Sequence, residues 1–179
     1  MRQKVSKSLL HRFMAELARR SHGPGKVYFT GGATALLLDL REQTIDIDIK
    51  IEPEPRGVFE AISALKNELD LNIELASPAD FIPAPAQWQE LATHVTKIDE
   101  LSFFHYDFAM QALAKIERGF SHDLTDAAAL ISKGYISVQQ LRERFSQIEP
   151  GLIRYPAIDA HRFALKVEQF IQSITRGST

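Results

Sequence analysis

The chain has 179 residues, a length that suits one domain, or one domain with a small addition. Its 21 Lys and Arg against 23 Asp and Glu give a net charge of −2, which argues against a general polyanion-binding protein. The absence of cysteine excludes disulfides, zinc–thiolate sites and a cysteine nucleophile. With no apolar run long enough for a membrane helix and no apolar region typical of a secretory signal, we expect a cytoplasmic protein with no membrane partner.

The first hundred residues alternate between helical and strand patterns. Apolar residues at helical spacing predict an amphipathic helix over residues 6–20, and the β-branched and aromatic run at 26–30 (KVYFT) is typical of a buried strand. Gly31 and Gly32 end that strand. Beyond them we expect a helix over 33–40, a strand over 44–52, a helix over 58–69, a strand over 71–76, a loop over 77–89 and one or two strands within 91–106.

The remaining residues follow a helical pattern to the end of the chain. Asp107 is well placed as the N-cap of the first of these helices. We expect helices over 108–119, 124–133, 138–145 and 157–175. The sequence therefore predicts an α+β chain, with a core of mixed sheet and helices over residues 1–106 and a helical bundle over 107–179 packed on that core.

The strand expected over residues 44–52 (TIDIDIKIE) carries two acidic residues on its polar face. The alternation places Ile45, Ile47 and Ile49 on one face, and Asp46 and Asp48 on the other, about 7 Å apart along the backbone. Two neighbouring carboxylates repel each other, and a divalent cation such as Mg²⁺ offsets this repulsion well. The alternative is a solvated strand with its polar residues outward.

The glycine pair has the layout of a phosphate-binding turn, since it links a strand to a helix. Glycine lets the backbone approach a ligand closely, and the N–H groups that begin a helix favour an anion. Thr34 adds a hydroxyl in the first turn, with helix capping as its other possible role. If the flanking strands are neighbours, Gly31 and Gly32 share one site with Asp46 and Asp48; otherwise they form an ordinary tight turn.

Further charged residues are candidates for the same site. Glu74 is on the polar face of a later strand and is a candidate third carboxylate, with Asp80 as its competitor and an exposed strand glutamate as the alternative. Arg41 suits a phosphate or a carboxylate, or it complements the dipole at the end of the preceding helix. Lys115 and Arg118 share one helical face, where they are candidates to bind a triphosphate, to form a salt-bridge network with Asp123 and Asp126, or to do both.

Two motifs together carry a family resemblance. FTGG at 29–32 followed by REQTIDIDI at 41–49 resembles the minimal nucleotidyltransferases of the DNA polymerase β-like superfamily. The motif Arg-x-x-Thr-x-Asp-Ile-Asp is followed downstream by Lys115, Arg118, Asp123 and Asp126. Together they are similar to the branch of uncharacterised and toxin–antitoxin-associated nucleotidyltransferases, which includes toxins of type IV abortive-infection systems. The sequence departs from many members by having Ala33 and Thr34 where they carry a serine.

The resemblance implies a fold, a reaction and partners. The fold would be a nucleotidyltransferase-type mixed sheet of four or five strands, with helices packed on it. The reaction would be Mg²⁺- or Mn²⁺-dependent transfer of a nucleoside monophosphate from an NTP, with Asp46, Asp48 and Glu74 as metal ligands. A protein hydroxyl, a tRNA 3′ end and a small molecule are open as acceptors. A non-catalytic nucleotide-binding or antitoxin-like module, and a toxin subunit with a cognate protein partner, are the competing hypotheses.

Overall fold

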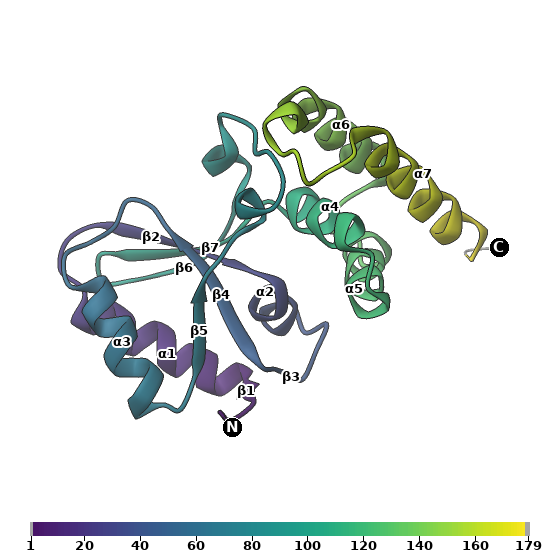
Figure 1. Cartoon of the computed structure of the whole chain (residues 1–179). Helices are drawn as coiled ribbons and strands as arrows, with labels where there is room; N and C mark the ends of the chain where they lie inside the picture. Colours follow the sequence, from purple (N-terminus) through teal and green to yellow (C-terminus); the bar gives the residue numbers. More distant parts are fainter. Residues whose placement is uncertain (1, 178–179) are drawn as a thin grey trace. The chain divides into compact units, whose positions relative to one another are not determined.

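The computed structural model describes residues 2–177, which form two compact units (Figure 1). The first unit runs to Ser77 and resumes over Ala92–Tyr106; the second comprises Pro78–Leu91 and the chain from Asp107 onward. The predicted α+β class is confirmed, with a mixed five-stranded sheet. None of the helices within residues 2–177 is both long and apolar enough to span a membrane.

The first unit is built around the five-stranded sheet, in the order β5 (Asn72–Leu75), β4 (Asp46–Ile51), β2 (Gly25–Thr30), β7 (Leu101–His105) and β6 (Thr93–Ile98). Strand β2 pairs antiparallel with β4 and parallel with β7, while β4 and β5 are parallel, and β6 and β7 antiparallel. A separate two-stranded pair joins β1 to β3. The elements are β1 (Val5–Ser6), α1 (Lys7–Arg20), β2 (Gly25–Thr30), α2 (Gly31–Leu37), β3 (Gln43–Thr44), β4 (Asp46–Ile51), α3 (Val58–Glu68), β5 (Asn72–Leu75), β6 (Thr93–Ile98) and β7 (Leu101–His105).

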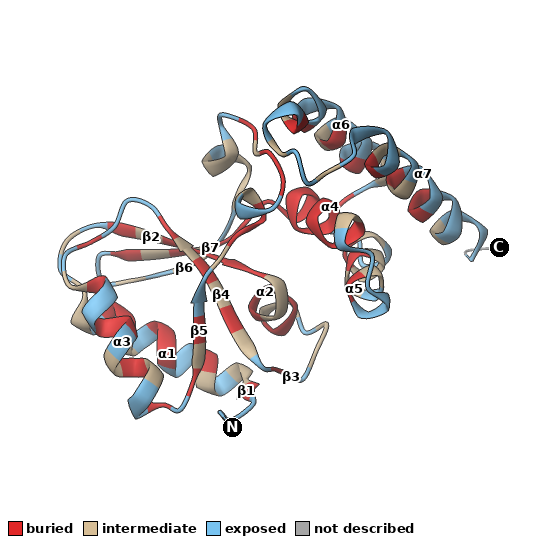
Figure 2. Ribbon diagram, viewed as in Figure 1, coloured by how far each residue is buried: buried red, intermediate tan, exposed pale blue. Residues whose placement is uncertain are grey.

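The apolar core of this unit lies between one face of the sheet and helices α1 and α3, which lie side by side (Figure 1). Ile47 and Ile49 of β4 point into it and are fully buried, whereas Asp46, Asp48 and Lys50, which alternate with them, are only partly buried. Figure 2 shows this alternation along β4. This alternation is what the period of a strand requires. The polar residues of β4 therefore occupy the opposite face.

One part of the strand prediction is wrong. We expect a continuous strand over residues 44–52, but the chain bends at Ile45, whose side chain is 63% exposed. Thr44 pairs with Val5 in the small β1–β3 ladder, so the sheet strand begins only at Asp46. Two different ladders on either side of Ile45 thus break the alternation that the sequence suggests.

The second unit is helical, and α4 (Phe108–Arg118) contacts α5 (Ser121–Ser132), α6 (Val138–Ile148) and α7 (Ala160–Arg176). Burial extends over most of α4 (Figure 2). The Asp107 carboxylate accepts the Met110 N–H, which confirms Asp107 as the N-cap. The elements are η1 (Pro78–Asp80), η2 (Trp88–Leu91), α4 (Phe108–Arg118), α5 (Ser121–Ser132), α6 (Val138–Ile148), η3 (Glu149–Arg154) and α7 (Ala160–Arg176).

Candidate functional site: an acidic strand pair beside a glycine turn

The strand register brings the acidic candidates onto one face of the sheet. Asp48 lies opposite Thr30, the last residue of β2, so the strand that precedes the glycine pair and the acidic strand are neighbours. On its other side Asp48 lies opposite Glu74 of β5, and Asp46 lies opposite Asn72. Residues directly opposite each other project to the same face, because both strands share one pleat. Asp46, Asp48 and Glu74 therefore share the polar face.

The glycine pair is packed directly against this acidic strand. Gly31 has a φ of 58°, in the left-handed region that favours glycine, and a Cβ there would lie 2.9 Å from the Asp48 Oδ2. A Cβ on Gly32 would lie only 1.9 Å from the Thr44 Oγ1. Gly31 is thus favoured mainly by its φ, and Gly32 by close approach, since the hydroxyl of Thr44 occupies the space that a side chain would need.

Asn72 separates two of the carboxylates and bonds to both. Its Nδ2 donates to the Asp46 Oδ1 at 2.6 Å and to the Glu74 Oε1 at 3.2 Å. The orientation of the amide is unambiguous, because carboxylates only accept hydrogen bonds. Asn72 thereby relieves repulsion between Asp46 and Glu74, whereas the repulsion that we expect a cation to offset is between Asp46 and Asp48.

The donor set suits a hard cation, although the carboxylates do not surround one position. Among residues 2–177, no group of three or more His, Cys, Asp or Glu side chains is close enough to hold a metal ion. Mg²⁺ is usually held by one or two carboxylates, with water and substrate phosphate completing its shell. Asp46 and Asp48, with the close glycine backbone beside Asp48, fit that requirement without a third protein ligand.

Thr34 lies beneath the turn. Its side chain is buried, and its Oγ1 donates to the Phe29 carbonyl at 3.1 Å and lies 3.1 Å from the Nδ1 of His105. Burial lowers the pKa of His105 to about 4, so its imidazole is neutral at pH 7. The N-cap of α2 is Thr30, so the hydroxyl of Thr34 has a structural role other than helix capping.

Two other candidates lie outside the strands that carry Asp46, Asp48 and Glu74. Arg41 is half-buried in the segment between α2 and β3, beyond the Leu38 C-cap of α2. Asp80, the competitor of Glu74, is exposed in η1 of the second unit. Glu74, by contrast, lies across from Asp48 in the first unit.

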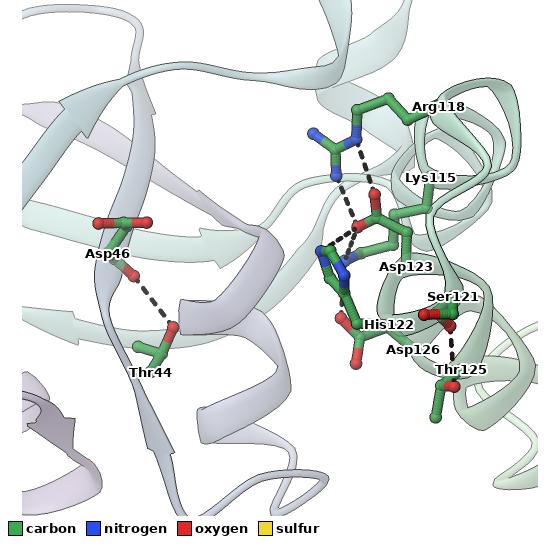
Figure 3. Close-up of polar contacts among 9 residues, drawn as sticks. All are labelled: Thr44, Asp46, Lys115, Arg118, Ser121, His122, Asp123, Thr125 and Asp126. Carbon is green, nitrogen blue, oxygen red and sulfur yellow. Dashed lines mark hydrogen bonds and ion pairs between the residues drawn. The ribbon is translucent and has the colours of Figure 1, made fainter.

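Lys115 and Arg118 take part in an ion-pair network between α4 and α5 (Figure 3). The Lys115 Nζ lies 3.3 Å from the Asp123 Oδ1 and 2.7 Å from the Asp126 Oδ2. Arg118 makes two hydrogen bonds to Asp123, at 3.0 and 2.8 Å. The salt-bridge alternative for these residues is confirmed, and two positive and two negative charges balance within the network.

The carboxylate of Asp123 is the buried centre of this network, with only 3% of its side chain exposed. Burial by itself would raise the pKa of Asp123, but the hydrogen bond from Arg118 and the charge of Lys115 outweigh burial and hold the pKa below its usual value. Asp123 is therefore ionised at pH 7, and its charge holds the two cations of α4 in place.

Sequence reasoning missed three residues that shape the site: Asn72, Thr44 and His105. Asn72 stands on a polar position of its predicted strand, so its orientation was readable, but its hydrogen-bond partners depend on register. Thr44 stands in the β1–β3 pair, which the strand pattern does not predict. His105 belongs to a strand that the pattern predicts only in outline. Comparison of the chain with protein-family models, with curated proteins and with solved structures found no match.

Proposed function

We propose that this chain is a Mg²⁺-dependent nucleotidyltransferase of the minimal, DNA polymerase β-like type. It would transfer a nucleoside monophosphate from an NTP to an acceptor hydroxyl. The observation that carries the proposal is the contact between the Asp48 carboxylate and the backbone of Gly31, with Asp46 on the same face of the same strand. An acidic pair for the metal and glycine backbone at the start of a helix for the phosphates are the two parts that such a reaction needs in one place.

The chemistry assigns a role to each residue of the site. Mg²⁺ or Mn²⁺, when bound, supplies positive charge against the phosphates. Asp46 and Asp48 would hold the cation, and the glycine turn would receive the triphosphate at its backbone. The acceptor oxygen bonds to the α-phosphorus, the bond from that phosphorus to the bridging oxygen breaks, and pyrophosphate leaves. The exposed carboxylate of Glu74 is the candidate that takes the acceptor's proton.

The ion-pair network of α4 and α5 bears on whether Lys115 and Arg118 can bind phosphate. Because Lys115 and Arg118 are already neutralised by Asp123 and Asp126, they offer a triphosphate no net positive charge as they stand. Phosphate binding by Lys115 would therefore require exchange with its carboxylate partners. We keep Lys115, Arg118 and Arg41 as predicted phosphate contacts, secondary to the acidic pair.

Calorimetry with ATP, GTP, CTP and UTP, each with and without Mg²⁺, tests the proposal. We expect Mg²⁺-dependent binding of at least one nucleotide. Replacing both Asp46 and Asp48 by Asn should weaken it by about tenfold or more, which corresponds to about 1.4 kcal/mol. Glu60→Gln is the matched control, because Glu60 is an exposed carboxylate of α3 outside the acidic face.

Two results would contradict this assignment. If wild-type protein binds no nucleotide in a Mg²⁺-dependent way, the transferase hypothesis is wrong. If the double Asn variant binds as well as Glu60→Gln, the site lies elsewhere. A transfer assay with labelled NTPs, offered protein, tRNA and small-molecule hydroxyls, then identifies the acceptor class and tests the toxin–antitoxin setting that the resemblance implies.

A non-catalytic nucleotide-binding or antitoxin-like module is the second candidate function. It is favoured by the absence, within residues 2–177, of a three-carboxylate group that could hold an ion. It is also favoured by the bonds of Asn72 to Asp46 and Glu74, which relieve repulsion without a metal. Nucleotide binding without any labelled transfer product would support this candidate over the enzyme.

A further inference from the structure

His105 differs from every other histidine of the chain in being buried. It ends β7, lies opposite Phe29 of β2 and is only 5% exposed, whereas the other five histidines are exposed. The proposed reaction gives this ring no task. Its Nδ1 is instead hydrogen-bonded to the hydroxyl of Thr34, which follows the glycine pair in the chain.

The direction of each hydrogen bond follows from proton counting. The carbonyl of Phe29 only accepts, so the Thr34 hydroxyl donates its single hydrogen there. The Thr34 oxygen must then accept from His105, which places the imidazole proton on Nδ1. The lowered pKa of His105, about 4, agrees with a neutral ring that carries one proton.

These hydrogen bonds connect the backbone before the glycine pair to the side chain of Thr34 after it. Phe29 is near the end of β2 and Thr34 is in α2, so the hydroxyl–carbonyl bond spans the whole Gly31-Gly32 turn. The backbone N–H of Tyr106 donates to the same carbonyl at 2.8 Å, which fixes Phe29 against the end of β7. His105 thus fixes the orientation of the Thr34 hydroxyl. That hydroxyl in turn holds the glycine pair in the position where Gly31 lies close to the Asp48 carboxylate.

We propose that His105 is a positioning residue that acts through Thr34 to hold the glycine turn against Asp48, and so strengthens metal–nucleotide binding without touching either ligand. This inference rests on the proposed function. It adds a residue from β7, outside both motifs, to the machinery of the site.

The first test uses the wild-type protein and nuclear magnetic resonance of its histidine ring nitrogens. We expect the signature of a neutral ring protonated at Nδ1 for His105. Thr34→Val keeps the shape of the side chain but removes the oxygen, so it should abolish this preference. A ring protonated at Nε2 in wild type would overturn the proposal, whatever the protein binds.

The second test is a double-mutant cycle on binding of Mg²⁺ with ATP, GTP, CTP or UTP, each measured by calorimetry. His105→Leu and Thr34→Val should each weaken binding by about tenfold, and the double variant by no more than either alone, because both break one chain of bonds. His105→Asn, whose amide can reach the Nδ1 position, and Thr34→Ser, which keeps the hydroxyl, should restore most of the affinity.

The outcomes separate this inference from the proposed function. Multiplied losses in the double variant, or no rescue by His105→Asn and Thr34→Ser, would overturn the positioning role. If wild type binds no nucleotide, the proposed function fails instead. Hydrogen exchange of the α2 amides then decides whether His105 holds the turn: faster exchange in His105→Leu, reversed in His105→Asn, supports it, and unchanged exchange contradicts it.

Discussion

Gly32 and Thr44 illustrate how individual residues define this site. The Thr44 hydroxyl lies against the backbone of Gly32 and also donates to the Asp46 carbonyl at 3.3 Å. It therefore joins the glycine turn to the first residue of the acidic strand (Figure 3 shows its bond to Asp46). A side chain at position 32 would have to displace this contact.

We expect Gly32→Ala to lower the free energy of unfolding by about 1–3 kcal/mol, the usual range for overpacking a well-packed position. Gly177→Ala is the matched control, because its new Cβ would meet atoms no closer than 3.5 Å. Urea unfolding measures both. Adding Thr44→Gly should recover much of the loss by making room. Equal stability of the two alanine variants would contradict the close packing of Gly32.

At this scale the sequence predicts residue types better than partners. The alternation around Asp46 and Asp48 correctly predicts that both side chains leave the core, because strand period alone decides that. The bonds of Asn72 to Asp46 and Glu74 depend on the pairing of β4 with β5, which no local pattern contains. His105 acquires its role in the same way, from the pairing of β7 with β2.

Among the elements, α4 and α5 are joined by an ion pair that is shielded from solvent, whereas α6 and α7 are joined by an exposed one. Lys115 and Asp123 have 9% and 3% of their side chains exposed, whereas the Arg142–Glu168 pair of α6 and α7 has 52% and 48% exposed. Coulomb attraction is screened far less in the first pair. Removing Asp123 also takes away one of the two carboxylates that compensate the buried charge of Lys115.

We expect Asp123→Asn to lower the free energy of unfolding by about 3 kcal/mol, as breaking a buried ion pair does. Glu168→Gln should cost less than about 1 kcal/mol, because its pair is exposed. Chemical denaturation of the two variants provides the comparison. If Asp123→Asn is as stable as Glu168→Gln, the network does not stabilise the second unit, and a ligand-binding role for Lys115 and Arg118 becomes the better explanation.

Element positions follow from the sequence wherever one face is uniformly apolar. The helix predicted over 6–20 is α1, and the one predicted over 58–69 is α3, within a residue or two at each end. The strand predicted over 44–52 fails at Ile45, because pairing with Val5 captures Thr44 into another ladder. Helix α2 begins at Gly31 rather than residue 33, since the left-handed φ of Gly31 allows the chain to turn at once.

For the whole molecule, the assignment of Pro78–Leu91 could not be predicted from chain order. This segment belongs to the helical unit although strands of the sheet precede and follow it. Tyr155 donates its hydroxyl to the Ala79 carbonyl at 3.1 Å, and Gly151 lies so close to Pro83 that a Cβ would come within 2.8 Å. Partners about seventy residues apart hold the segment there, beyond the reach of local composition.

Stability of the whole protein should decline on mild acidification, because His105 is buried and neutral. Its pKa falls from 6.5 to about 4 on folding, so the unfolded chain binds the extra proton first. The contribution is complete above pH 6.5 and is lost as pH falls from 6.5 to about 4, by about 3 kcal/mol in all. Urea unfolding between pH 7 and 4 measures the slope, which should flatten in His105→Asn. An equal slope in both proteins would refute this.

Asn72 has a consequence for how tightly the proposed site would bind divalent cations in the cell. Its amide bridges Asp46 and Glu74, so part of the repulsion among the carboxylates of this face is relieved by the protein itself. A cation that used Asp46 as a ligand would compete with that amide. Its measured affinity would therefore include the loss of the hydrogen bond from Asn72 to Asp46. Free divalent ions would then regulate the occupancy of the proposed site by competing with a hydrogen bond of the protein itself.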